Sequence, residues 1–163
     1  MDTDIRDWDG VVNAIRKNDV EALRRHVEAD GSRTLVDPDY GWTVYHLCVI
    51  NNRPECLQYA LDSSWENLDA VATGGLYKGL TALMLAALEG RKECAELLVG
   101  GGADVEAVAA GGSHGCEGLT AAAIAEKEGH AEVAHAIQAA LPSVGAVRVS
   151  VHVQLSFSVL LTL

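Results

Sequence analysis

The strongest constraint on the fold of this chain is an internal repeat. Three segments of the same pattern begin at Gly41, Gly79 and Gly118, so that their starts lie 38 and 39 residues apart. Each has a threonine two residues after the glycine, then a short apolar stretch, then an Asn or Gly, and then a second apolar stretch with helical spacing. A period of this length indicates a stack of units in which each unit packs only against its neighbours.

The residues between the apolar stretches predict two helices in each unit. The opening glycines suit a tight turn, and each repeated threonine stands where its hydroxyl can cap the first amides of a helix. Each first helix is expected to end at an Asn or Gly, which tolerates the left-handed conformation after a helix. The caps are Thr43, Thr81 and Thr120, and the helix ends are Asn52, Gly90 and Gly129. Pro54 suits the first position of a second helix.

A further unit precedes the three repeats. Residues 11–27 show the same order of helix, turn and helix, and the turn residue Asn18 lies 34 residues before Asn52. This segment lacks the Gly-x-Thr opening and is heavily charged, as expected of a terminal unit with one face in solvent. The sequence therefore predicts four helix pairs.

The repeated units resemble the ankyrin repeat over roughly residues 7–141. Thr43 to His46 match the family's Thr-Pro-Leu-His element, residues 81–84 match it loosely, and residues 97–105 match the close of the repeat. The resemblance implies an all-α, ankyrin-type solenoid of about four stacked helix-turn-helix units with long hairpin-like connections. It also implies that His46 hydrogen-bonds a neighbouring unit. Because the units exceed the usual length of ~33 residues, the surplus is assigned to residues 63–69 and 108–117.

These patterns divide the chain into a repeat domain over residues 7–142 and a non-repeat tail over residues 143–163. In the tail, apolar and polar residues alternate from Val147 to Val159, which predicts a β-like strand. Two interpretations stay open for it, a strand that docks on a partner and a divergent or mis-assigned end of the coding sequence. The expected core is Leu47, Leu57, Leu83, Leu85, Ala86, Leu97, Ala122, Ile124 and Ile137.

Charge and the N-terminal sequence restrict the partners and the location. The net charge of −11 would repel a phosphate backbone, so nucleic acid is not expected as a partner. The first ten residues are acidic and polar, unlike a signal or transit peptide, and no run of about 20 apolar residues predicts membrane insertion. With four cysteines and no secretion signal, the thiols are expected to be reduced and the location intracellular, cytoplasmic or nuclear.

The sequence offers little for catalysis or metal binding. His46 with Cys48 and His114 with Cys116 form two H-x-C pairs, but there is no C-x-x-C and no further set at zinc-site spacing. Cys56 and Cys94 occupy equivalent places in successive units, which predicts small buried residues. There is no G-x-S-x-G and no phosphate loop, so no enzymatic activity, metal, cofactor or small-molecule substrate is expected.

The resemblance implies that a partner protein binds across the hairpin tips and the inner face of the first helices. Large aromatic residues fall at these positions, and such residues dominate interface hot spots, although Trp42 could instead pack under its own turn. The main function expected is a protein–protein interaction module, and the alternative is a regulatory or targeting fragment of a larger multidomain enzyme. The candidate binding residues are Tyr40, Trp42, Ile50, Asn51, Tyr77, Lys78, Leu88, Glu89, Glu117 and Lys127, and the alignment also places Leu80, Leu119 and Glu128 at these positions, with Arg16 and Lys17 extending the strip at its N-terminal end.

Overall fold

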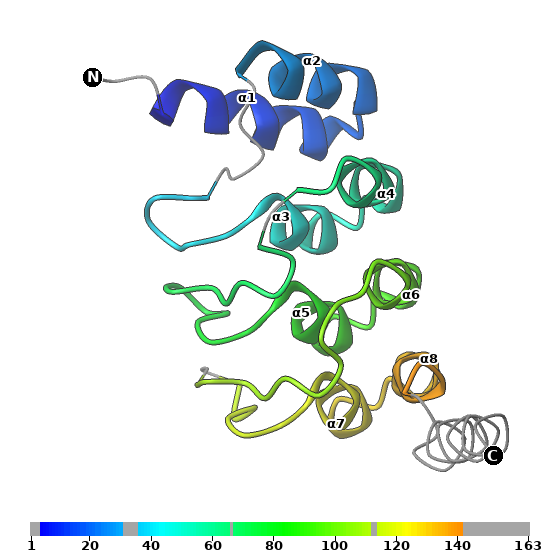
Figure 1. The fold of residues 1–163 in the computed structure, drawn as a ribbon. Helices are drawn as coiled ribbons and strands as arrows, with labels where there is room; N and C mark the ends of the chain where they lie inside the picture. Colours follow the sequence, from blue (N-terminus) through cyan, green and yellow to red (C-terminus); the bar gives the residue numbers. More distant parts are fainter. Residues whose placement is uncertain (1–3, 31–35, 66, 112–113, 142–163) are drawn as a thin grey trace, which may run out of the picture.

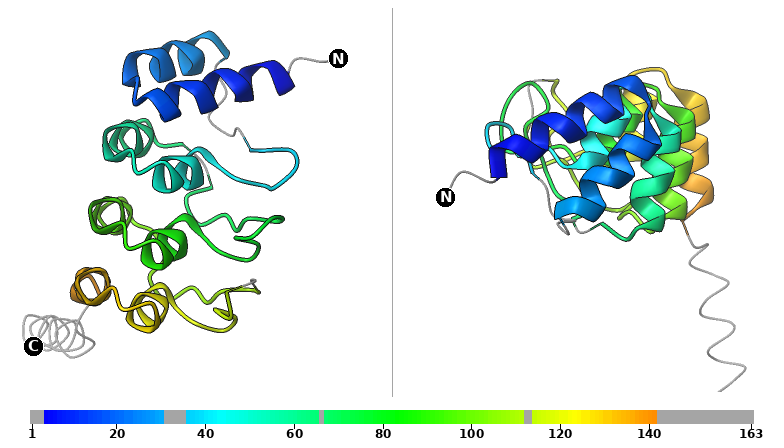
Figure 2. Two further views of the ribbon diagram at one scale, coloured as in Figure 1. Left: turned by 180° about the vertical axis from the view of Figure 1, so that it is seen from behind. Right: turned by 90° about the horizontal axis from the view of Figure 1, so that it is seen from above.

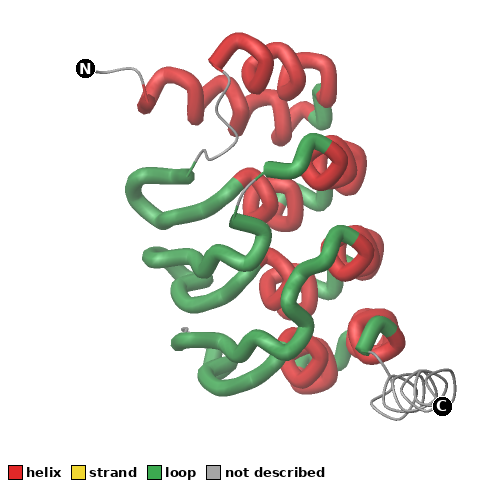
Figure 3. The backbone as a smooth tube through the Cα atoms, in the orientation of Figure 1, coloured by secondary structure: helices red, strands yellow, loops and turns green. Residues whose placement is uncertain are grey.

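The computed structural model describes residues 4–30, 36–65, 67–111 and 114–141. Within these ranges the chain forms eight helices and no strand, arranged as four antiparallel helix pairs stacked one on another (Figures 1 and 3). This arrangement confirms the expected all-α solenoid of four units. The strand predicted in the tail lies outside the described residues.

The helices form two rows, and long loops project to one side of the stack (Figure 2). The inner row, next to the loops, consists of α1 (Asp4–Lys17), α3 (Val44–Ile50), α5 (Ala82–Leu88) and α7 (Ala121–Lys127). The outer row consists of α2 (Val20–Asp30), α4 (Pro54–Asp62), α6 (Lys92–Gly100) and α8 (Ala131–Ala139). Each helix packs against its partner in the pair and against the equivalent helix of the next unit, as in a one-dimensional stack.

The residues that repeat in the sequence begin and end these helices. The Thr81 hydroxyl accepts the N–H of Met84 at 3.3 Å, and the Thr120 hydroxyl accepts the N–H of Ala123 at 3.4 Å. Asn52 ends the first helix of its unit with a φ of 51°, in the left-handed region predicted for it. Pro54 occupies the start of α4 as expected.

His46 joins two units in the interior of the stack. Its Nδ1 accepts the N–H of Thr43 at 3.2 Å, and its Nε2 lies 3.1 Å from the carbonyl oxygen of Leu80 in the next unit. Because a carbonyl can only accept, Nε2 carries the proton and the ring is neutral. Burial lowers the pKa of His46 to about 4, although the bond to Leu80 acts in the opposite direction. The bridging role implied for this residue is confirmed.

The core runs the length of the stack and agrees with the expected set at every position but one. Leu97 is only partly buried, and its neighbour Leu98 is buried instead. In α6 the face toward the stack is formed by Cys94, Ala95 and Leu98, and Leu98 lies one turn after the other two, so Leu97 falls on the outer side. Cys56 and Cys94 are fully buried, which confirms the prediction for them.

The extra length of the repeats lies mainly in the hairpin tips. Backbone hydrogen bonds pair Asp37 with Trp42, Ala72 with Leu80 and Ala109 with Leu119. Residues 38–41 lie between the partners in the first tip, residues 73–79 in the second and residues 110–118 in the third. The surplus assigned to residues 108–117 is thus confirmed. The one assigned to residues 63–69 was placed too early, because that stretch directly follows the end of α4 at Asp62 and holds the buried Trp65.

Candidate functional site: the hairpin tips

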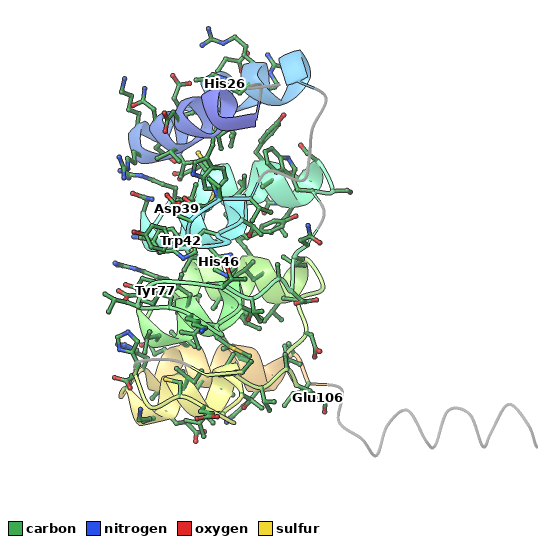
Figure 4. The ribbon with its side chains drawn as sticks, turned by 90° about the vertical axis from the view of Figure 1, so that its left-hand side faces the viewer. His26, Asp39, Trp42, His46, Tyr77 and Glu106 are labelled. Carbon is green, nitrogen blue, oxygen red and sulfur yellow. The ribbon has the colours of Figure 1, made fainter. Side chains whose placement is uncertain are left out.

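The hairpin tips bring together aromatic rings from three successive units. The ring centroids of Tyr40 and Trp42 lie 5.3 Å apart, those of Trp42 and Tyr77 6.1 Å apart, and those of Tyr77 and His114 5.8 Å apart in a stacked arrangement. Figure 4 faces this edge of the stack and shows Trp42 above Tyr77. We define these four residues and Leu76 as the tip surface.

Hydrogen bonds from the first tip to its neighbours hold Tyr40 in place. The Oδ1 of Asp37 accepts the N–H groups of Asp39 at 2.8 Å and of Tyr40 at 2.7 Å. The Oδ2 of the same carboxylate accepts the indole N–H of Trp8 at 3.0 Å, which ties the first tip to α1. The carbonyl oxygen of Tyr40 accepts the N–H of Thr73 at 2.9 Å, so the second tip is bonded to the first.

The second tip is bonded to the third in the same way, since the carbonyl oxygen of Gly79 accepts the N–H of Ala110 at 3.0 Å. Gly79 has a φ of 83°, and a Cβ atom added there would lie 2.7 Å from the backbone nitrogen of Gly111. Only glycine therefore allows these two tips to approach so closely. The three tips form one continuous, hydrogen-bonded edge.

Trp42 is half-buried at the centre of the tip surface. Its ring lies between the rings of Tyr40 and Tyr77 and also packs against the core. Its indole N–H is buried and has no acceptor among the described residues. The residue therefore packs against a neighbouring unit as well as its own turn, and part of its ring stays accessible.

The ends of the inner helices contact the tips of their own units. The hydroxyl of Tyr77 donates to the Oε1 of Glu89 at 3.1 Å, and burial, followed by the nearby Glu89 charge, raises the pKa of Tyr77. The ammonium group of Lys127 donates to the carbonyl oxygens of His114 at 2.6 Å and Gly115 at 3.2 Å. These bonds place Glu89 and Lys127 beside the rings.

The other candidate residues divide into packed and exposed positions. Ile50 and Leu88 are partly buried and pack against the core, and the side-chain amide of Asn51 donates to the carbonyl oxygen of Leu47 at 2.9 Å. These three side chains thus contribute to the packing and hydrogen bonding of the inner helices. Lys78 and Glu117 are exposed on the second and third tips.

The sequence analysis did not select Leu76 and His114. The Leu76 side chain is 63% exposed, the highest value among the large apolar residues described as exposed, and His114 is exposed and stacks on Tyr77. Both lie in the lengthened tips. The additional length of residues 73–79 and 110–118 was the signal that could have identified them, since added tip residues have no place in the helix packing.

The described residues provide no arrangement suited to nucleophilic or metal chemistry. All four cysteines are free and buried. Burial raises the pKa of Cys48 and raises those of Cys56 and Cys94 to about 11, so these thiols stay protonated at neutral pH. No group of three or more His, Cys, Asp or Glu side chains in the described ranges could hold a metal ion. No helix of these ranges is long and apolar enough to cross a membrane.

Two comparisons with known proteins agree with this architecture. A family model described as ankyrin repeats in three copies matches residues 11–109. The B-cell lymphoma 3 protein homolog of Mus musculus is 36% identical to this chain over 88 residues. The matched stretch is 54% of this chain and 19% of that protein, so the chain corresponds to about a fifth of the length of this relative.

Proposed function

Since this chain belongs to the ankyrin repeat family, we propose that it is a protein-binding module whose tip surface recognises a partner protein. Ankyrin repeats generally act as protein–protein interaction modules. The observation that carries the proposal is the row of rings formed by Tyr40, Trp42, Tyr77 and His114 along one edge of the stack.

Exposure and rigidity both favour binding at this edge. The Leu76 side chain is 63% exposed and the Tyr40 side chain 45% exposed, so two large apolar groups face solvent at neighbouring tips. Tyr and Trp side chains dominate protein interfaces because they bury a large area for little loss of conformational entropy. The hydrogen bonds between the tips hold the surface in one conformation, which reduces the entropy lost when a partner binds.

The charge of the chain guides the choice of partner. With a net charge of −11, a neutral or basic protein surface is favoured over nucleic acid. The buried, protonated thiols of Cys48, Cys56 and Cys94 and the neutral, buried His46 favour binding over catalysis. An intracellular location, a repeat domain over residues 7–142 and the absence of a small-molecule substrate stay predictions. The alternative function, a fragment of a multidomain enzyme, gains no support from any contact among the described residues.

The proposal is tested by capturing partners from a cell extract with the full chain and identifying them by mass spectrometry. Tyr40→Ala/Leu76→Ala removes exposed apolar groups, so the fold should persist while the affinity of a captured partner falls at least about tenfold. Trp42→Ala/Tyr77→Ala should remove binding more completely. Leu141→Ala is the matched control, because this leucine is also exposed but lies beyond α8.

A chain that ends at Pro142 separates the tip surface from the tail. Undiminished capture by this chain, together with loss in the tip variants, supports the proposal. If the truncated chain no longer captured the partner while both tip variants bound it fully, residues 143–163 would be the binding segment, and the proposal would be contradicted.

A further inference from the structure

The outer row of helices carries a groove between α4 and α6 that the tip surface does not use. Its apolar lining is Tyr59, Leu61 and Leu97, with Val20 and Pro54 at the end nearest α2. Tyr59, Leu61 and Leu97 are all partly exposed. The two helices that form it, α4 and α6, belong to the row of helices away from the projecting loops (Figure 1).

Acidic side chains flank this apolar floor. Glu55 and Asp62 extend from α4, Glu93 and Glu96 extend from α6, and no lysine or arginine is among the described residues that line the groove. Glu55 accepts the side-chain N–H of Asn18 at 3.1 Å, and Asp62 accepts that of Gln58 at 2.7 Å.

Glu93 and Glu96 differ from these two carboxylates, because neither forms an ion pair or a side-chain hydrogen bond within the described ranges. Two carboxylates with unused acceptor capacity thus stand beside an apolar strip. A segment with both cationic and apolar side chains would complement both features.

The next groove along the outer row, between α6 and α8, lacks this combination. Its floor consists of Ala131, Ala136 and Ala139, and its rim carries the ion pair between Lys92 and Glu132 at 3.3 Å. Glu96 borders both grooves, but among the described residues of the α6–α8 groove it has no large apolar side chain beside it other than those of α6. The position of Tyr59 in α4 and Leu97 in α6 is thus occupied by Ala136 in α8. Large apolar groups and unpaired carboxylates meet at the α4–α6 groove.

We propose that the α4–α6 groove is a second docking site, which takes a cationic amphipathic helix of a partner protein. The basic residues of the partner helix face Glu93 and Glu96, and its apolar residues contact the floor of the groove formed by Tyr59 and Leu97. A helix laid in an apolar groove is a common mode of peptide recognition. The net charge of −11 disfavours a second copy of this chain as the occupant, because two acidic surfaces repel each other. Since the groove and the tip surface lie on different sides, both can bind at once.

The test uses two fluorescein-labelled peptides of about four helical turns, roughly 14 residues. One has Lys and Leu at helical spacing, and in the other every Lys is replaced by Glu. Fluorescence anisotropy with the full chain should show saturable binding of the cationic peptide and no binding of the acidic one. Glu93→Lys/Glu96→Lys should lower the affinity for the cationic peptide by at least about tenfold. Leu97→Ala should lower this affinity by about threefold to tenfold through loss of apolar contact.

The matched control is Asp9→Lys/Glu106→Lys, which makes the same change in net charge at two exposed positions away from the groove. This variant should keep the affinity within about threefold, because exposed charges beyond the Debye length of about 8 Å are largely screened. Equal losses in the two charge variants would show a bulk charge effect and overturn the proposal. Loss in Tyr40→Ala/Leu76→Ala with unchanged binding by Glu93→Lys/Glu96→Lys would place the peptide on the tip surface and also overturn it, while leaving the proposed function intact.

Discussion

The interior seam between units and the hairpin tips are built from the same repeats but in opposite ways. At the seam, equivalent residues recur with little change in kind, as Leu47, Leu85 and Ile124 do, and all three are buried. At the tips, the three units differ in length and in residues, and Tyr40 and Leu76 stay exposed.

The difference indicates which part of a repeat specifies the fold and which part specifies binding. A residue at the seam contacts equivalent residues above and below, so its size and polarity are restricted by both neighbours. A tip contacts the adjacent tips and the end of the inner helix of its own unit, but an exposed added residue such as Leu76 can vary without disturbing the helices. A stack of this kind can therefore keep its structure while its partner changes.

The largest expected contrast is between a seam leucine and a tip leucine. Leu83→Ala leaves a cavity where α5 packs against α3 and α7, so we expect the free energy of unfolding to fall by about 2–5 kcal/mol. Leu76→Ala should change it by less than about 0.5 kcal/mol. Urea denaturation followed by circular dichroism measures both values. Similar losses in the two variants would contradict the division between seam and tip.

The second contrast concerns pH. Because burial lowers the pKa of His46 to about 4, the unfolded chain binds a proton between pH 6.5 and 4 that the folded chain does not. Stability is therefore lost as the pH falls through this window, and His46 should account for about 2 kcal/mol of that loss by pH 5.

The comparison of His46→Gln with the wild type isolates this effect from the titration of carboxylates. The variant should lose less stability between pH 7.5 and pH 5, whereas His135→Gln, at an exposed position, should behave like the wild type. Parallel pH profiles for His46→Gln and the wild type would show that the buried ring does not control the response.

A third contrast separates a glycine between two tips from its equivalent in the last unit. Gly79→Ala forces a Cβ atom against the backbone of Gly111 at a positive φ, so we expect a loss of about 2 kcal/mol. Gly118→Ala has a similar φ of 75° but no atom within 4 Å of the added Cβ, so a loss of about 1 kcal/mol is expected. Thermal unfolding of both variants checks the order, and a larger loss for Gly118→Ala would contradict it.

The smallest expected effect is at the junction of a tip with an inner helix. Tyr77→Phe removes the hydrogen bond to Glu89 but keeps the ring stack, so the free energy of unfolding should fall by about 0.5–1 kcal/mol. Tyr40→Phe is the control, because its hydroxyl forms no hydrogen bond with the described residues, and its stability should stay within about 0.5 kcal/mol of the wild type. A larger loss of stability for Tyr40→Phe than for Tyr77→Phe would contradict a stabilising role of the hydrogen bond between Tyr77 and Glu89.

The sequence predicted the helices well because their signals are local. Thr81, Asn52 and Pro54 each act within one or two turns, and a repeated pattern multiplies the evidence. The orientation of α6 was less accessible, since Leu97 and Leu98 are adjacent leucines and only packing against the neighbouring helices decides which is buried.

The tip surface was only partly predictable for a different reason. Tyr40, Trp42 and Tyr77 could be aligned to binding positions, but their contact depends on how three loops from successive units lie together. Leu76 and His114 lie in the lengthened tips and have no counterpart in a standard repeat. The α4–α6 groove had no sequence signal, because it joins side chains of two helices 38 residues apart.

The central claim, that a partner protein binds at the tips, is tested most directly by hydrogen–deuterium exchange of the full chain with and without a captured partner. We predict slower exchange of the backbone amides in residues 39–42 and 73–78 when the partner is bound, with α4 and α6 unchanged. Protection confined to the outer helices, with the tips exchanging as in the free chain, would contradict the account.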